Sequence, residues 1–182
     1  MLKIGIIVAS VRDNANGTAV GEWMYNFATA RKDEGVEYEV VALKDYDLPM
    51  ITTMAQAATG PVIDQWKAKM AEFDGYIFVT PEYNRSVPGA FKNALDFLTV
   101  EVNNKAVGYV AYGGLVGLAA IMSLRTIAAE QAMADTKTMV TFSLMTDFEN
   151  FSVFKPFDYH QANANGLLNE VISWSTALKT VR

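Results

Sequence analysis

The chain has 182 residues, of which 51% are hydrophobic and 19% are charged, a composition that suits a globular protein with one substantial core. Its formal net charge of -5 argues against a nucleic-acid-binding surface, because neutralising phosphates requires clustered Lys and Arg. The absence of cysteine excludes disulfides, thiolate nucleophiles and cysteine-based metal sites.

The first element in chain order is the apolar run in MLKIGIIVAS. This run is too short for a transmembrane helix and lacks the cleavage pattern of a signal peptide. We therefore expect a buried strand at the start of a soluble, cytoplasmic protein without a membrane partner.

Short apolar runs then alternate with segments of helical period. Continuous β-branched runs are typical of parallel strands covered on both faces. The expected strands are 2–9, 36–43, 74–80, 105–112 and 136–144, and the expected helices are 18–32, 61–72, 88–98, 117–134 and 164–180. Repeated βαβ units predict an α/β fold: one flavodoxin-like domain over residues 1–182, with a five-stranded parallel sheet of order 2-1-3-4-5 and helices on both faces. A larger dinucleotide-type sheet is the alternative, and five strands favour the smaller one.

The longest irregular stretch is 43–61. A loop of this length in a compact domain is often functional or part of an interface. Met50 and Met54 are candidates to face a pocket or a dimer partner. In an open parallel sheet, however, ligands bind outside the carboxyl ends of the strands, which directs attention to loops 10–17, 80–87 and 112–117.

The first of these loops reads SVRDNANGT and runs into a helix. Free backbone N–H groups at a helix start attract anions, and the guanidinium of Arg12 suits a phosphate. Neither GxGxxG nor a Walker sequence is present. The loop therefore predicts a phosphate cradle without a metal. The alternative is an ordinary turn with Thr18 as helix cap and a solvated Arg12.

The second loop, TPEYNRSVPGAF, is richer in specialised residues than a connector requires. Pro88 follows the pattern of a helix start, and Ser86 is placed to cap that helix. Tyr83 offers a flat aromatic face, and Asn84 offers both a donor and an acceptor, which suits the edge of a flat polar heterocycle. The alternative is a capped turn with exposed polar residues.

The third loop begins at Tyr112 and continues with Gly113, Gly114 and Gly117. Glycines permit positive φ angles and close approach of the backbone to a ligand, and Tyr112 could flank a ring. A plain glycine-rich turn before the next helix is the alternative.

Taken together, ASVRDNANG, PEYNRSVPGAFKNALDFL and YGGLVGLAAIMSLRTI resemble the NAD(P)H-dependent FMN reductase family, which has a flavodoxin-like fold. The resemblance covers about residues 1–150, and the middle motif is its specific part. It implies a flavoprotein with bound FMN, and the residues that would bind the FMN fall into three groups. The FMN phosphate would be held by Ser10, Arg12, Asn16, Gly17 and Thr18; the isoalloxazine and ribityl chain by Pro81, Glu82, Tyr83, Asn84 and Ser86; and the pyrimidine edge by Tyr112, Gly113 and Gly114.

The resemblance also implies an enzyme: an FMN-dependent oxidoreductase that takes hydride from NADPH or NADH at the flavin N5 and passes electrons to a small acceptor, such as free flavin, a quinone or an azo compound. Because the flavin performs the chemistry, no side chain is expected to be catalytic and no metal is expected. Family members commonly form homodimers or homotetramers. The alternative function is a flavodoxin-like electron carrier that docks to redox proteins, although the first loop lacks the Thr/Ser-rich phosphate loop of flavodoxins.

Two features depart from the family pattern or fall outside it. Ala9 stands where a Gly is common, and the stretch after Gly114 lacks an Arg that many members carry, which leaves the second substrate open. The segment 146–165 follows no recognisable motif, and its aromatic residues are expected to pack over a pocket or against a partner. His160, which we place in a loop, is expected to be structural or solvent-facing, because a metal site needs several ligands.

Overall fold

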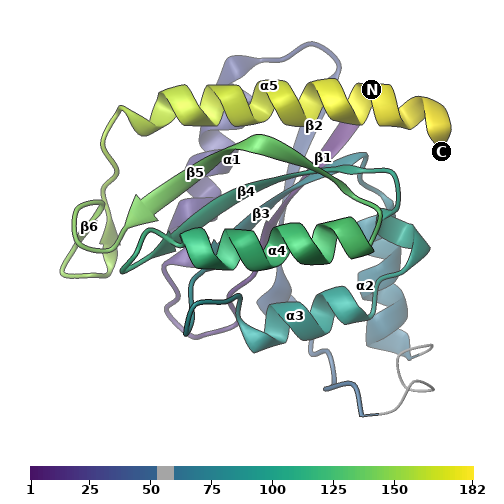
Figure 1. Ribbon diagram of the computed structural model, residues 1–182, viewed down its shortest axis with the longest axis horizontal. Helices are drawn as coiled ribbons and strands as arrows, with labels where there is room; N and C mark the ends of the chain where they lie inside the picture. The colour runs from purple at the N-terminus through teal and green to yellow at the C-terminus, as the bar shows by residue number, and fades with distance from the viewer. Residues whose placement is uncertain (53–59) are drawn as a thin grey trace.

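The computed structural model describes residues 1–52 and 60–182 (Figure 1). Its main feature is a five-stranded sheet of order β2-β1-β3-β4-β5, in which every neighbouring pair is parallel. The strands are β1 Leu2–Val8, β2 Val36–Ala42, β3 Gly75–Pro81, β4 Ala106–Gly113 and β5 Ala134–Ser143. This order is that of flavodoxin-like folds, so the predicted fold class and strand order are confirmed.

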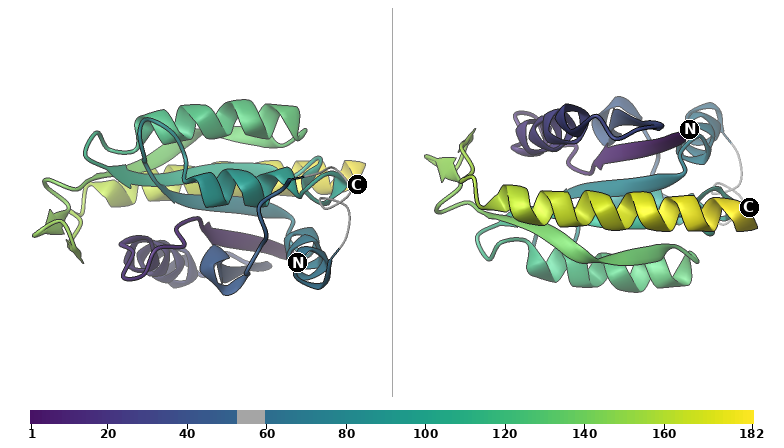
Figure 2. Two further views of the ribbon diagram at one scale, coloured as in Figure 1. Left: turned by 90° about the horizontal axis from the view of Figure 1, so that it is seen from below. Right: turned by 90° about the horizontal axis from the view of Figure 1, so that it is seen from above.

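Helices cover both faces of the sheet. The longer helices are α1 Gly17–Arg31, α2 Pro61–Ala71, α3 Gly89–Asp96, α4 Leu118–Glu130 and α5 His160–Leu178, and short 3-10 turns occupy Leu43–Asp45, Val100–Val102 and Lys179–Val181. Helices α1 and α5 pack on one face, and α2, α3 and α4 pack on the other, which produces two separate apolar clusters. Figure 1 shows α5 above the sheet and α3 and α4 below it, and Figure 2 shows α5 lying along its own face.

Burial explains why the central strands read as continuous apolar runs. Every residue of β3 and β4 is buried, because helices cover each side of these strands. The edge strand β2 is only partly buried, which matches its weaker, alternating pattern. Met54 and the middle of stretch 43–61 lie outside the described residues, whereas Met50 is exposed.

Lys105, directly before β4, is a buried cation at the amino end of the sheet, away from the loops that follow the carboxyl ends of the strands. Its side chain is 5% exposed. Nζ donates to the carbonyl oxygens of Ala71 at 2.9 Å and Met70 at 3.3 Å, at the end of α2, and lies 3.2 Å from the Tyr76 hydroxyl. Burial lowers the pKa of Lys105 to about 8.

We expect the Lys105→Met variant to change how stability depends on pH. The folded-state pKa of about 8 lies below the ordinary 10.5, so the unfolded state binds more protons between these values, and the stability of the wild type rises with pH there. Relative to the variant, the free energy of unfolding of the wild type should increase by up to about 3 kcal/mol between the two pKa values. Urea unfolding at pH 7.5, 8.5 and 9.5 measures the free energy of unfolding of both proteins. The same pH dependence in the two proteins would contradict the prediction.

Candidate functional site

A pocket of about 310 Å³ lies where the loops after β1, β3 and β4 meet, at the carboxyl ends of the strands. This volume is within the range of small-molecule sites. Each of the three loops contributes residues that the sequence had singled out. Of the predicted site residues, those that line the pocket are Arg12, Asn16, Pro81, Glu82, Tyr83, Tyr112 and Gly113.

The other predicted residues do not line the pocket. Ser10 and Gly17 are buried behind it, with the Ser10 hydroxyl 3.4 Å from the hydroxyl of Tyr83. Gly17 packs so closely on Tyr112 that an added Cβ would lie 2.9 Å from the phenolic oxygen. Three more, Thr18, Asn84 and Gly114, are solvent-exposed, and Ser86 turns toward α4.

The loop between β1 and α1 contains several backbone hydrogen-bond donors without a partner. Within the described chain, the backbone N–H groups of residues 10–16 donate to no other residue, and the first turn of α1 adds the positive end of a helix dipole. The exposed Arg12 forms no ion pair with any described residue, and its guanidinium carbon lies 5.8 Å from the ring centre of Tyr83. Unpaired amides beside a guanidinium without an ion pair are the groups that a phosphate-sized anion requires.

The second loop turns sharply at its centre. Tyr83 and Ser86 exchange backbone hydrogen bonds of 2.9 and 3.0 Å around Asn84 and Arg85, whose φ angles are 50° and 69°. Two successive left-handed residues make this a type I′ turn. The turn holds the ring of Tyr83 at the pocket while Asn84 and Arg85 point to solvent.

The expectation that Ser86 caps the following helix is wrong. Helix α3 begins at Gly89 with Pro88 at the capping position, and no side chain caps it. The Ser86 hydroxyl lies instead 3.3 Å from the hydroxyl of Ser123 in α4. The type I′ turn directs Ser86 away from the α3 amides, and sequence spacing does not reveal that geometry.

Glu82 connects the second and third loops. Its backbone N–H donates to the Tyr112 carbonyl at 3.0 Å, and its Oε2 accepts the N–H of Ala119 at 3.0 Å, in the first turn of α4. A carboxylate at a helix N-terminus is favourable. Gly117, which precedes this helix, has φ 78°, and an added Cβ would lie 2.6 Å from that of Ala111. The charge of Glu82 therefore stabilises the scaffold of the third loop.

Tyr112 lines the pocket, and its hydroxyl lies behind the lining, among residues of the first loop. Burial raises the pKa of Tyr112 well above its ordinary value, so the phenol stays neutral at physiological pH. The hydroxyl lies next to Ser10 and Gly17, which ties the third loop to the first.

Sequence reasoning missed a small hairpin at the pocket edge. Strands β6 Phe148–Glu149 and β7 Val153–Phe154 pair antiparallel, and Figure 1 labels β6 beyond the arrowhead of β5. Two-residue strands are too short to show an alternating pattern. The pocket-lining residues that we did not predict are Asn14, Ala15, Leu144, Phe151 and Ser152. The aromatic content of segment 146–165 was the available signal, and the expectation that its aromatics pack over a pocket is confirmed for Phe151.

The hairpin is anchored at its base by a buried pair. His160 Nε2 lies 2.8 Å from Asp147 Oδ1, and the two residues are 3% and 1% exposed. Asp147 Oδ2 also accepts the N–H of Ser143 at 2.8 Å. His160 is thus a structural residue, and it is the first residue of α5 rather than part of a loop, which corrects our placement.

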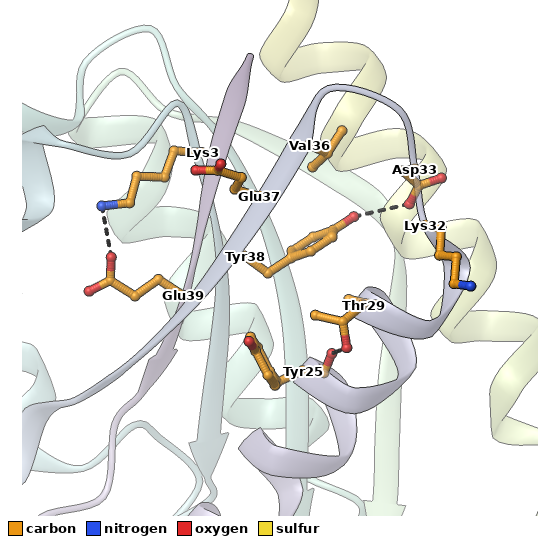
Figure 3. Close-up of a pocket in the computed structure, with 10 residues that line it drawn as sticks. Lys3, Tyr25, Thr29, Lys32, Asp33, Val36, Glu37, Tyr38 and Glu39 are labelled. Carbon is orange, nitrogen blue, oxygen red and sulfur yellow. Dashed lines mark hydrogen bonds and ion pairs between the residues drawn. The ribbon is translucent and has the colours of Figure 1, made fainter.

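A second depression, of about 420 Å³, lies along the edge strand β2 and is shown in Figure 3. Some of its polar groups pair with one another: the Tyr38 hydroxyl donates to Asp33 at 3.1 Å, and Lys3 lies 2.7 Å from Glu39. Since no carboxyl end of a strand opens into this depression, we assign the functional site to the three loops.

Over residues 1–52 and 60–182, no cluster of His, Asp and Glu side chains is arranged to hold a metal ion. In the same part of the chain, no helix is both long and apolar enough to cross a membrane.

Comparisons with known proteins point in one direction. A family model described as NADPH-dependent FMN reductase matches residues 2–147. The NAD(P)H-dependent FMN reductase ntnL of Nectria sp. is 32% identical over 158 residues, which cover 81% of this chain and 79% of the relative. A 2-hydroxy-1,4-benzoquinone reductase of Burkholderia sp. is 25% identical over 165 residues, covering 91% of this chain and 84% of the relative. The solved structure of FerB, a flavoenzyme NAD(P)H:(acceptor) oxidoreductase from Paracoccus denitrificans, superimposes with a TM-score of 0.72 at 17% identity, covering 95% of this chain and 98% of that one.

Proposed function

The chain belongs to the NADPH-dependent FMN reductase family, and from this membership we propose how its own residues hold the cofactor and serve the reaction. The protein is an NAD(P)H-dependent FMN oxidoreductase, as the sequence resemblance had implied. Membership in an enzyme family disfavours the alternative of an electron carrier that docks to redox proteins.

The first loop is proposed to bind the FMN phosphate. The observation that carries this proposal is the set of unpaired backbone N–H groups at residues 10–16 beside the unpaired guanidinium of Arg12. The residues present therefore fit a phosphate-bearing cofactor. Asn16, Gly17 and Thr18 bring the start of α1 to the same place, with Ser10 buried beneath it.

The second and third loops are proposed to hold the flavin ring and the ribityl chain. Tyr83 and the closely packed backbone at Gly113 both line the pocket. The full proposed set in these loops is Pro81, Glu82, Tyr83, Asn84, Ser86, Tyr112, Gly113 and Gly114. Because Glu82 places its carboxylate on α4 and donates its backbone N–H to Tyr112, its contribution would be to hold the second and third loops together around the ligand.

Bound FMN supplies hydride and electron transfer between a nicotinamide and an acceptor. The chain's residues then need only to bind, orient and exclude water, and no side chain is proposed as an acid, base or nucleophile. Free flavins and quinones are the proposed acceptors, since relatives carry the names FMN reductase and benzoquinone reductase. An azo compound would suit the same chemistry, and NADPH and NADH are both candidate donors.

The FMN-binding unit is proposed to be the single domain 1–182, because residues from both the amino-terminal loops and the carboxyl-terminal hairpin line one pocket.

A homodimer or homotetramer is proposed as well. An apolar row is exposed next to Gly113, at the start of α4, and it consists of Leu115, Val116, Leu118 and Met122. Exposed apolar groups in such a row are typical of self-association surfaces.

We expect the purified protein to take up FMN and to show a flavin spectrum that NADPH or NADH bleaches. Anaerobic titration of the FMN-loaded protein measures both the flavin bound and the reductant consumed. A protein that binds no flavin would contradict the proposed function. Binding without bleaching by either nicotinamide would favour the carrier instead.

A further inference from the structure

The tip of the β6–β7 hairpin is held in an unusual backbone conformation. Asn150 and Phe151 have φ angles of 50° and 59°, and the N–H of Ser152 donates to the Glu149 carbonyl at 3.1 Å. This is again a two-residue turn of type I′, whose central positions favour Asn and Gly. Asn150 suits its position, but a bulky aromatic residue at the second position carries backbone strain. Such strain persists only where the surroundings impose it, and it is concentrated at functional sites.

The surroundings do hold Phe151 in place. Its carbonyl oxygen accepts a 2.8 Å hydrogen bond from Asn16 Nδ2, which ties the hairpin tip to the first loop. At the hairpin base, the rings of Phe148 and Phe154 lie 4.9 Å apart, and Phe154 also contacts Phe142 of β5 at 4.9 Å. The Phe151 backbone is therefore anchored on two sides.

Phe151 lines the pocket shared with Tyr83 and Tyr112, yet the residue is 59% exposed. Within the described part of the chain it stacks on no other aromatic ring, unlike its neighbours Phe148 and Phe154. An exposed, rigidly presented ring at a pocket edge gains apolar and stacking contact only when a flat ligand occupies the pocket.

We infer that Phe151 is a flavin-binding residue: its ring packs against the ring system of the bound FMN, and the hairpin forms a third wall of the site. This inference rests on the proposed function. The match to the family model ends at residue 147, so the hairpin is a feature of this chain outside the matched segment. The ligand contacted is the flavin rather than the acceptor, because Phe151 lines the same pocket as Tyr83 and Tyr112, which are proposed to hold the flavin ring, and the Asn16 hydrogen bond holds the hairpin tip beside the first loop.

The test compares Phe151→Gly with Asn150→Gly. Each variant places a residue suited to left-handed φ in the same turn, but only Phe151→Gly removes the ring. The dissociation constants of FMN and riboflavin are measured on the apoprotein by quenching of flavin fluorescence. We expect Phe151→Gly to weaken both ligands about 10-fold, as for the loss of one aromatic stacking partner. Asn150→Gly should stay within about twofold of the wild type, and Phe151→Tyr should bind like the wild type.

The pattern of losses separates the possible explanations. Equal affinities in Phe151→Gly and Asn150→Gly would overturn the inference, and so would a loss confined to FMN, which would indicate an effect on the phosphate loop. Unchanged flavin affinity with a raised KM for the acceptor would also overturn it, since the ring would then contact the second substrate. Failure of this inference can be told apart from failure of the proposed function. If the inference fails, the wild type still binds flavin; if the proposed function fails, the wild type binds none. Melting temperatures establish that each variant is folded, and Phe151→Tyr supplies a variant with the backbone and ring retained.

Discussion

The Arg12→Ala variant is expected to bind FMN about 10- to 100-fold more weakly than the wild type, which corresponds to losing one charge-assisted hydrogen-bonding group worth about 1.5–3 kcal/mol. Riboflavin, which lacks the phosphate, should bind the two proteins equally. The reason is that Arg12 forms no ion pair within the described chain and stands beside free amides, so its charge is available to the ligand. Fluorescence titration of the apoprotein with each ligand measures both constants.

The matched control for Arg12→Ala is Lys92→Ala. This change removes one cation from the surface of α3, where Lys92 pairs with Asp96 at 2.6 Å, away from the pocket. The control should leave both affinities unchanged, which excludes an effect of net charge alone. Equal weakening of FMN and riboflavin in Arg12→Ala would remove Arg12 from the phosphate role. Raising the salt concentration should narrow the difference between the wild type and Arg12→Ala, since the contact is exposed.

The Asp147→Ala variant is expected to lower the free energy of unfolding by about 3–5 kcal/mol. Asp147 is 1% exposed and its carboxylate accepts from the backbone at Ser143 while facing His160 at 2.8 Å. Its removal leaves a buried imidazole and a backbone N–H without their partner, and it detaches the start of α5 from the end of β5. Urea unfolding of the apoprotein measures the loss.

A double-mutant cycle with His160→Ala separates the pair from general damage to the core. If the two side chains act together, the double variant should be more stable than the sum of the single losses predicts, by at least about 1 kcal/mol. Additive losses would contradict the pairing. Glu149→Ala is the control on the same hairpin, because its ion pair with Lys155 is solvent-exposed, and it should leave the melting temperature essentially unchanged.

The loops at the strand ends show how far the sequence could lead. Arg12, Tyr83 and Tyr112 were singled out by residue type after three separate apolar runs, and parallel pairing brings them to one pocket. Period and composition suffice for this step, because the carboxyl ends of parallel strands meet at one edge of the sheet. The same reasoning could not assign Glu82, whose carboxylate acts on α4, a helix that begins 36 residues further along the chain.

The carboxyl-terminal third shows where such reasoning stops. The strands of the hairpin contain two residues each, and Asp147 and His160 are separated by a hairpin whose turn has no glycine. Neither the strands nor the buried pair leaves a periodic signal, and the position of Phe151 depends on a hydrogen bond to Asn16, 135 residues earlier. Contacts of this kind are specified by packing between distant segments.

By itself, the sequence determined the alternation of strands and helices, the parallel sheet of order 2-1-3-4-5 and the three loops that carry the proposed flavin-site residues. It could do so because hydrophobic period and turn chemistry are local properties of the chain. Only the tertiary structure decided which predicted residues reach the pocket, that Ser86 and Glu82 turn toward α4, and that Phe151 stands at the pocket edge. Those outcomes depend on side-chain directions and on hydrogen bonds between segments far apart in the chain, which become defined when the two faces of the sheet are packed.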